Sequence, residues 1–277
     1  MDTSSEHDEA SRSHRADCLR DDIMRMSKQK RKESKASGAN HTQEANVSLS
    51  VTIESIYDPL CPWTYIGHMR MRRALASASH IDPTIVYVPY IFDDETPMPP
   101  LSWKDYVKLK YPDRVDRIMG QKLIQTMNAA AEEGIKFEDY VNRPMSEVTT
   151  ALRLLRHCQE IGQGQAYVEA LMISHFEYNL DISNKDVIRD CAMDCGVDAK
   201  TVEACFIDDS TLSWVWDEHS RARQIHQVKS CPHYFIKENF SGVSISISGA
   251  EGVEGWISAF DRLTKAKRGT RVLSWPL

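Results

Sequence analysis

The pattern of apolar and polar positions divides the chain near residue 47. Residues 1–46 are polar, rich in Ser, Lys, Arg, Asp and Glu, and nearly free of aromatic side chains. Such a segment cannot bury enough apolar surface to offset its ordering entropy, so we predict a disordered polar tail. Directly after it, apolar and polar residues alternate in VSLSVTIESIYD, which predicts a β-strand.

The first segment after the tail predicts a strand–helix–strand unit. The first strand ends at DPLCP, where Pro62 suits the first turn of a helix. Residues 63–78 then carry helical periodicity, and residues 84–92 are β-branched and aromatic, which predicts a second strand. Because both strands are apolar, we interpret the unit as a βαβ crossover with a parallel pair.

The composition from residue 101 to about residue 209 is helical, and glycines or Asn/Asp clusters separate the predicted helices. These helices run over residues 112–133, 146–161, 164–179, 184–195 and 199–207. After another helix over residues 210–226, HYFIKE and VSISIS flank NFSG and predict an antiparallel hairpin. An amphipathic helix over residues 252–268 follows, and residues 269–277 are left as a C-terminal extension.

Bulk composition narrows the class of protein. An apolar fraction of 42% over 277 residues allows a sizeable core, and a net charge of -6 argues against nucleic acid or an anionic membrane as the main partner. No run reaches the length of a membrane span, and the first residues lack a secretory pattern, so we expect a cytoplasmic protein. The 7 cysteines, an odd number, do not suggest a disulfide framework.

Three stretches carry a resemblance to a known superfamily. DPLCPWTYIG resembles the motif D-x-x-C-P-W-C-x-x-G, SCPHYFI resembles a segment whose proline is cis, and SGAEGVEGW resembles S-G-A-Q at a last strand-to-helix turn. The chain thus resembles the DsbA-like thioredoxin superfamily, in particular its FrnE-like branch. The same superfamily contains 2-hydroxychromene-2-carboxylate isomerases and kappa-class glutathione transferases.

The resemblance covers residues 47 to about 266 and implies an α/β, thioredoxin-like fold with a large all-helical insertion. The thioredoxin-like domain would be discontinuous, over residues 47–100 and 210–268. The insertion would occupy residues 101–209 and form a lid that chooses the substrate.

Cys61 is the candidate nucleophile. Free N–H groups and the positive dipole end at the start of a helix favour an anion, so a thiol there has a lowered pKa. Pro62 takes the position where its missing N–H costs nothing, and it is also a candidate for substrate contact. The alternative is that Cys61 is an ordinary apolar cysteine.

Two departures from the family motif concern sulfur. Thr64 stands where the resolving cysteine would be, and its hydroxyl can donate to a thiolate but cannot release a mixed disulfide. Cys231 stands just before the proline, a position that the resemblance puts near the first cysteine. We therefore hypothesise that Cys231 comes close enough to Cys61 for a disulfide or a shared metal. The alternative is an isolated thiol that fills space.

Further candidates for substrate binding flank these positions. The resemblance implies that Pro232 is a cis-proline, which would expose the backbone before it to an extended substrate or glutathione. Trp63 could line the binding site of an aromatic substrate, or it could have only a packing role. His233 could act as an acid or base, or it could be a half-exposed strand residue without a catalytic role. Asn142 could contact the substrate or shape a turn.

For the other residues with reactive side chains we predict a structural role rather than a catalytic one. His68, one helical turn beyond Thr64, is predicted to lie at the surface. No metal-ligand spacing accompanies the remaining cysteines of the folded part, so core packing is predicted for Cys158, Cys191, Cys195 and Cys205.

These features predict a thiol-dependent oxidoreductase with a single cysteine in the CPWT motif and glutathione as co-substrate. The first alternative is a glutathione-dependent isomerase or transferase that acts on a small metabolite. The second is a non-catalytic binding protein of thioredoxin fold. We expect a small-molecule or thiol/disulfide substrate and no metal, nucleic-acid or membrane partner, and we leave a homodimer open.

Overall fold

The computed structural model describes residues 48–96 and 99–272, with side chains as far as residue 266. The predicted polar tail over residues 1–46 lies outside the described residues, as do the last five residues of the predicted C-terminal extension.

The central sheet has the strand order β2-β1-β5-β6. Strands β1 and β2 are parallel, whereas β5 is antiparallel to both β1 and β6, so the predicted parallel pair and hairpin are confirmed. The strands are β1 (Leu49–Tyr57), β2 (Ile81–Pro89), β5 (His233–Glu238) and β6 (Ser244–Ser248).

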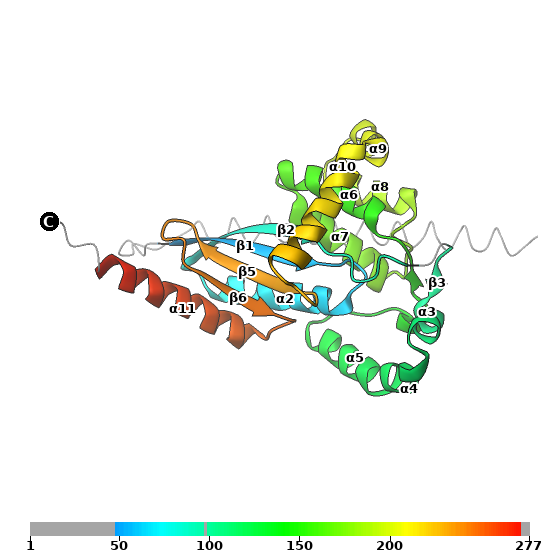
Figure 1. Cartoon of the computed structure of the whole chain (residues 1–277), viewed down its shortest axis with the longest axis horizontal. Helices are drawn as coiled ribbons and strands as arrows, with labels where there is room; N and C mark the ends of the chain where they lie inside the picture. The colour runs from blue at the N-terminus through cyan, green and yellow to red at the C-terminus, as the bar shows by residue number, and fades with distance from the viewer. Residues whose placement is uncertain (1–47, 97–98, 273–277) are drawn as a thin grey trace, which may run out of the picture. The chain divides into compact units, whose positions relative to one another are not determined.

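Helices pack on both faces of this sheet (Figure 1). One face carries α2 (Pro62–Ser77) and α11 (Val253–Val272), which bury Trp256 and Phe260 against Val51 and Ile53. The other face holds a smaller cluster of buried residues around Ile56, Val88 and Ala222. The alternation along β1 explains both layers, because successive strand side chains point to opposite faces.

The predicted order of elements is confirmed, with helices between β2 and β5. The insertion and its continuation comprise β3 (Leu101–Ser102), α3 (Trp103–Lys110), η1 (Pro112–Arg114), α4 (Val115–Arg117), η2 (Ile118–Lys122), α5 (Leu123–Glu132), η3 (Tyr140–Asn142), β4 (Pro144–Met145), α6 (Thr149–Glu160), α7 (Gly164–Phe176), α8 (Lys185–Asp194), α9 (Ala199–Ile207), α10 (Asp209–Ser220) and η4 (Arg221–Ile225).

Three local predictions were wrong. Helix α3 was not predicted, although Ser102 caps it by accepting a hydrogen bond from the Asp105 N–H. The predicted helix over residues 112–133 is broken at Gly120, whose φ of -92° and ψ of -105° are not helical. The last helix continues to Val272 rather than ending at residue 268, so the start of the predicted extension is helical.

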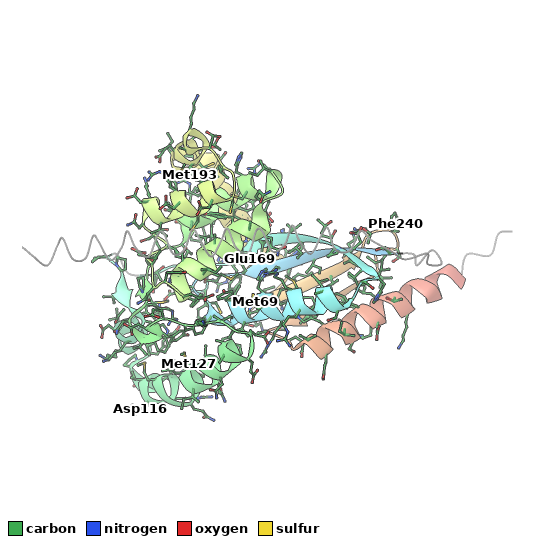
Figure 2. The ribbon with its side chains drawn as sticks, turned by 180° about the vertical axis from the view of Figure 1, so that it is seen from behind. Met69, Asp116, Met127, Glu169, Met193 and Phe240 are labelled. Atoms are coloured by element: carbon green, nitrogen blue, oxygen red, sulfur yellow. The ribbon has the colours of Figure 1, made fainter. Side chains whose placement is uncertain are left out.

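His68 is buried, not at the surface as predicted. Its Nε2 lies 2.9 Å from Glu169 Oε1, and Arg72 Nη1 lies 3.3 Å from the same oxygen. Figure 2 shows Glu169 on α7, facing α2. Periodicity could not reveal this contact, because it infers burial from an apolar stripe, whereas α2 is covered both by the sheet and by the insertion, and His68 is a polar residue on its second covered side.

Gly67 lets the loop before β5 approach α2. A Cβ at this position would lie 2.6 Å from Tyr234 Oη, 3.0 Å from Pro232 Cγ and 3.2 Å from Ala250 Cα. The last of these atoms belongs to the backbone, so the contact cannot be relieved by rotating a side chain. The glycine of the CPWTYIG stretch therefore sets the distance between the first turns of α2 and the proline loop.

We expect Gly67→Ala to lower the free energy of unfolding by about 1–3 kcal/mol, as overpacking of a dense core does. Gly255→Ala is the matched control, since the three atoms nearest to its Cβ would all belong to the flexible side chain of Glu251, which can move away. Alanine in that helix should be neutral or stabilising. Chemical denaturation measures both changes, and equal stability of the two variants would contradict this account of Gly67.

Candidate active site

The site starts at the turn between β1 and α2. Asp58 organises the turn, because its Oδ1 accepts from the Leu60 N–H and its Oδ2 accepts from the Phe92 N–H, both at 2.8 Å. Cys61 follows as the residue preceding the helix, and its carbonyl accepts from the Thr64 N–H at 3.0 Å. The Cys61 thiol thus lies at the N-terminus of α2, where the helix dipole favours a negative charge.

The loop before β5 brings a second thiol to this turn. The Cys231–Pro232 peptide bond is cis, as the resemblance implied. In its protonated form Cys61 Sγ donates to the Cys231 carbonyl oxygen at 3.6 Å. The Cys231 side chain also lowers the pKa of Cys61, and both residues are half-buried and free. The structure therefore brings Cys61, Thr64 and Cys231 together.

The two thiols shift each other's ionisation in opposite directions. Hydrogen bonding from Cys231 lowers the pKa of Cys61, and the Thr64 backbone and hydroxyl lower it further, whereas burial and the Asp58 charge oppose them. The same hydrogen bond, burial and the Cys61 charge raise the pKa of Cys231 well above its ordinary value. Cys61 is therefore the first thiol of the pair to ionise, and Cys231 is the second.

Thr64 and Asp58 form the buried side of this arrangement. The Thr64 Oγ1 is buried without a hydrogen bond of ordinary geometry, but its hydroxyl lowers the pKa of both neighbouring thiols. Burial raises the pKa of the Asp58 carboxyl to about 6, although the two backbone N–H groups that it accepts oppose this shift. The carboxylate in turn raises the pKa of both thiols when it ionises.

A cavity of about 540 Å³ opens onto Cys61. Its walls come from the first turn of α2, from α3 to α5, and from the segment around η3 and β4. Most wall residues are apolar or aromatic, so the cavity suits a small molecule with an apolar body. The aromatic wall residues are Trp63, Phe92, Trp103, Tyr106, Tyr111 and Tyr140.

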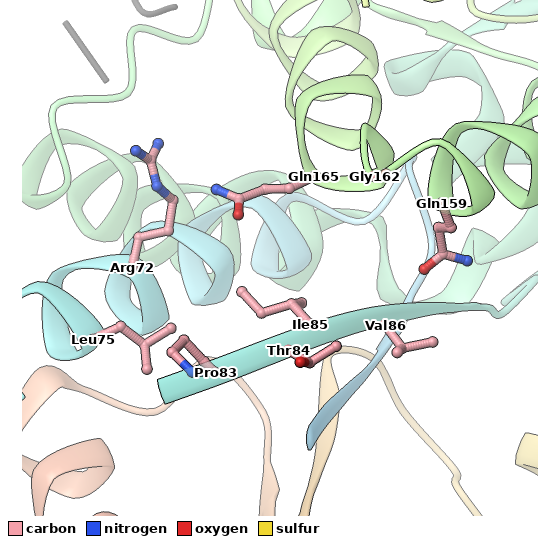
Figure 3. A pocket seen from close by; sticks show the side chains of 10 residues that line it. Arg72, Leu75, Pro83, Thr84, Ile85, Val86, Gln159, Gly162 and Gln165 are labelled. Carbon is pink, nitrogen blue, oxygen red and sulfur yellow. The ribbon is translucent and has the colours of Figure 1, made fainter. Parts of the chain in front are cut away.

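A second cavity of about 590 Å³ lies between β2 and the start of α7 (Figure 3). Its walls include Arg72, Ile85, Gln159 and Gln165. The Gln159 side chain bonds the backbone N–H and carbonyl of Tyr87 and so covers part of the sheet edge. No cysteine lines this second cavity, so thiol chemistry can take place only in the cavity that opens onto Cys61.

Of the other residues predicted to contact substrate, some line the cavity and others do not. Pro62 and Trp63 line the cavity beside Cys61. Pro232 packs against Gly67 instead, and His233 lies on β5 with its ring against Phe235, so neither lines the cavity. Asn142 is exposed, and its amide donates to the Asp139 carboxylate, which is the turn-forming alternative.

Two residues of the site were missed by the sequence reasoning. Asp58 opens the stretch DPLCPWTYIG but received no predicted role, although its position just after a strand was a signal. Arg143 follows Asn142 and lines the cavity with a side chain that is only 1% exposed. No sequence pattern marks an arginine as buried, because this residue is usually at the surface.

The remaining cysteines of the described part are core residues, as predicted. Burial raises the pKa of Cys158 and of Cys191 to about 12, and it also raises the pKa of Cys195 and Cys205. Within residues 48–96 and 99–272, no group of three or more His, Cys, Asp or Glu side chains is placed to hold a metal ion. The described helices also include none that is long and apolar enough to cross a bilayer.

Known proteins share both the sequence pattern and the fold of this chain. The family model for the DSBA-like thioredoxin domain matches residues 52–259. No curated protein sequence matches the chain. Among solved structures, a probable DsbA oxidoreductase from Streptomyces coelicolor is 21% identical, with a TM-score of 0.65, covering 82% of this chain and 92% of that one.

Two further structures have the same fold. A 2-hydroxychromene-2-carboxylate isomerase is 14% identical, with a TM-score of 0.58, covering 79% of this chain and 98% of that one. The cytosolic disulfide reductase DsbM from Pseudomonas aeruginosa is 14% identical, with a TM-score of 0.53, covering 78% and 99%, and it has also been solved with GSH. The predicted thioredoxin-like fold with a helical insertion is confirmed, and the chain belongs to the family of DsbA-like thioredoxin domains.

Proposed function

We propose that this protein is a thiol–disulfide oxidoreductase in which Cys61 is the nucleophile and Cys231 is its partner. The observation that carries the proposal is the pair of free cysteines at the N-terminus of α2, in which Cys61 Sγ lies 3.6 Å from the Cys231 carbonyl oxygen. In this pair the pKa of Cys61 is lowered and that of Cys231 is raised, so one sulfur ionises first and attacks while the other stays protonated, as disulfide exchange needs.

The first step is attack on a substrate disulfide. The Cys61 thiolate forms a bond to one substrate sulfur, the substrate S–S bond breaks, and the second substrate sulfur leaves as a thiolate. The product is a mixed disulfide on Cys61. Because the attacking sulfur is half-buried at the mouth of the cavity, the substrate sulfur reaches it from the cavity side.

The second step uses the change in charge that the first step produces. The Cys61 thiolate is a main reason for the raised pKa of Cys231, through the hydrogen bond and through its charge. Once Cys61 is in a mixed disulfide, that charge is gone, and the pKa of Cys231 falls. Cys231 then loses its proton to solvent, attacks Cys61 Sγ and releases the substrate thiolate, which leaves a Cys61–Cys231 disulfide.

Glutathione is the proposed reductant. Two glutathione thiols reduce the Cys61–Cys231 disulfide and leave as oxidised glutathione, so the cycle balances. All six cysteines of the described part are free, which fits a reducing compartment such as the cytoplasm. The fold shared with DsbM, which has been solved with GSH, supports the choice of this thiol.

A glutathione-dependent isomerase or transferase is the second candidate. Its support is the aromatic cavity of about 540 Å³, which suits a small ring better than a folded protein. In this alternative, a thiolate adds to a conjugated substrate and leaves again, so no disulfide forms. Exchange assays separate the two candidates, because only the oxidoreductase consumes a disulfide.

We expect Cys61 to be alkylated by iodoacetamide with a pH midpoint below that of an ordinary thiol, about 8.5, because Cys231 and the helix stabilise its thiolate. Cys231→Ala should raise this midpoint by removing the S–H donor. Mass spectrometry of the peptide containing Cys61 measures both. Cys205→Ala is the control, since that thiol lies in the insertion, and an unchanged midpoint in Cys231→Ala would contradict the proposed pairing.

We expect Cys231→Ser to trap the mixed disulfide. After incubation with oxidised glutathione, the intact mass of this variant should show one glutathione that persists, because serine cannot attack Cys61. The wild type should show mainly a protein disulfide, and Cys61→Ser should show neither product at the site. If wild type and Cys231→Ser retain the same adduct for the same time, glutathione alone resolves Cys61, and Cys231 has no resolving role.

We expect Asp58→Asn to lower the pKa of Cys61, since the carboxylate raises it when ionised. In the wild type, ionisation of Asp58 near pH 6 should produce a second inflection in the alkylation profile that the variant lacks. Asp105→Asn is the control, since its carboxylate is exposed and bonds Ser102 and Lys108. A Cys61 midpoint that rises in Asp58→Asn would overturn the assigned direction.

A further inference from the structure

Arg143 is a buried cation without a carboxylate partner. Its side chain is 1% exposed, yet within the described part of the chain no Asp or Glu forms an ion pair with it. Burial lowers the pKa of the guanidinium from its high ordinary value. Moving a charge out of water without pairing it costs several kcal/mol, so an arginine in this position needs an explanation.

The guanidinium is surrounded by aromatic rings. Their centroids lie 3.8 Å from its Cζ for Tyr140, 4.9 Å for Trp103 and 5.6 Å for Phe176. These cation–π contacts stabilise the charge. They supply no oxygen or nitrogen acceptor for the N–H groups, so they leave the hydrogen-bond donors unused.

Those donors are mostly unpaired. Of the five N–H groups, the described residues accept from Nη1 alone, which donates to the Tyr140 carbonyl at 2.8 Å. The Nε atom is buried and has no hydrogen-bond partner. The nearby His175 adds no second positive charge, because burial and Arg143 lower its pKa to about 3 and keep it neutral.

Arg143 belongs to the wall of the cavity that opens onto Cys61. A Cys61 thiolate raises the pKa of both Arg143 and Tyr140, so the sulfur and the guanidinium act on each other electrostatically. Arg114 and Lys122 also line this cavity and add positive charge to it. The Asp93 carboxylate in the same wall is already paired with Lys110.

We propose that Arg143 binds the carboxylate of a small, largely aromatic ligand whose reactive sulfur lies at Cys61. This inference rests on the proposed function, since it assumes that Cys61 is the reacting sulfur. A carboxylate accepts from the free edge of a guanidinium through two charge-assisted hydrogen bonds, while the aromatic walls cover the ligand body. The ligand thereby supplies the charge that the protein leaves unpaired.

Two aromatic disulfides test the proposal. The anionic probe is 5,5′-dithiobis(2-nitrobenzoate), with one carboxylate on each ring, and the neutral probe is 4,4′-dithiodipyridine. With either probe, the Cys61 thiolate bonds to one probe sulfur, the probe S–S bond breaks, and one aryl thiolate leaves. Stopped-flow absorbance of the first released thiolate gives the rate constant. Mass spectrometry in the Cys231→Ser background, where the adduct persists, assigns it to Cys61.

We expect Arg143→Met to slow the anionic probe by about tenfold to a hundredfold, as the loss of a charge-assisted hydrogen bond does, with little change for the neutral probe. Arg143→Lys should recover part of the rate, because it keeps the charge without the planar fork. Arg156→Met is the matched control, since Arg156 is exposed and pairs with Glu160 on α6, outside the cavity. It should leave both rates unchanged.

Thermal stability separates this role from a structural one. Arg143→Met should keep or raise the melting temperature, because it replaces a buried, unpaired charge by an apolar side chain of similar length. A clear loss of stability together with equal slowing of both probes would overturn the proposal, because that pattern indicates a packing residue. Equal slowing with a shifted pH midpoint of Cys61 would also overturn it, because Arg143 would then act on the thiolate rather than on the ligand.

The source of the carboxylate is tested by a third arm with oxidised glutathione. A dependence on Arg143 with this disulfide but not with the aromatic probe would overturn the assignment of an aromatic ligand. If neither aromatic probe reacts at Cys61 in the wild type, the proposed function fails as well. If both react at rates that are independent of Arg143, only the present inference fails.

Discussion

The contact between the first turn of α2 and the loop before β5 is the constraint on which the rest of the site depends. It places Cys231 beside the Cys61 thiol, so the pKa of Cys61 is lowered and that of Cys231 is raised. Gly67 makes the approach possible, because any Cβ there would meet Pro232, Tyr234 and the backbone of Ala250. A helix dipole alone favours an anion at Cys61 only modestly, whereas a direct S–H donor in a half-buried setting does so more strongly.

This arrangement changes how the missing cysteine of the CPWT motif is understood. With Thr64 at the third position after Cys61, the helix supplies a hydroxyl that lowers the pKa of both thiols but cannot accept a disulfide. The second sulfur comes from a distant part of the sequence, at the end of the cis-proline loop. Because the Cys231 pKa depends on the Cys61 charge, the loss of that charge in a mixed disulfide would lower the Cys231 pKa and prepare the second thiol to attack.

The helical insertion contributes the other half of the site. Its segments from α3 to β4 enclose the cavity and surround Arg143 with aromatic faces, and its helix α7 is tied to α2 through Glu169 and His68. The thioredoxin-like part thus provides the sulfur chemistry, and the insertion provides shape and positive charge. An unpaired charge inside a protein is tolerated more readily when a bound ligand of opposite charge pairs with it.

The sequence by itself determined the order of strands and helices, the position of Cys61 at the start of a helix and the core role of the remaining described cysteines. These features follow from short-range patterns: alternation in β1, Pro62 at a helix start, and Cys191 and Cys195 on one helical face. Tertiary structure alone decided that His68 is buried, that His233 and Asn142 lie outside the cavity, and that Arg143 lies inside it. Those outcomes depend on which surfaces two segments far apart in the chain present to each other, and local periodicity carries no information about that pairing.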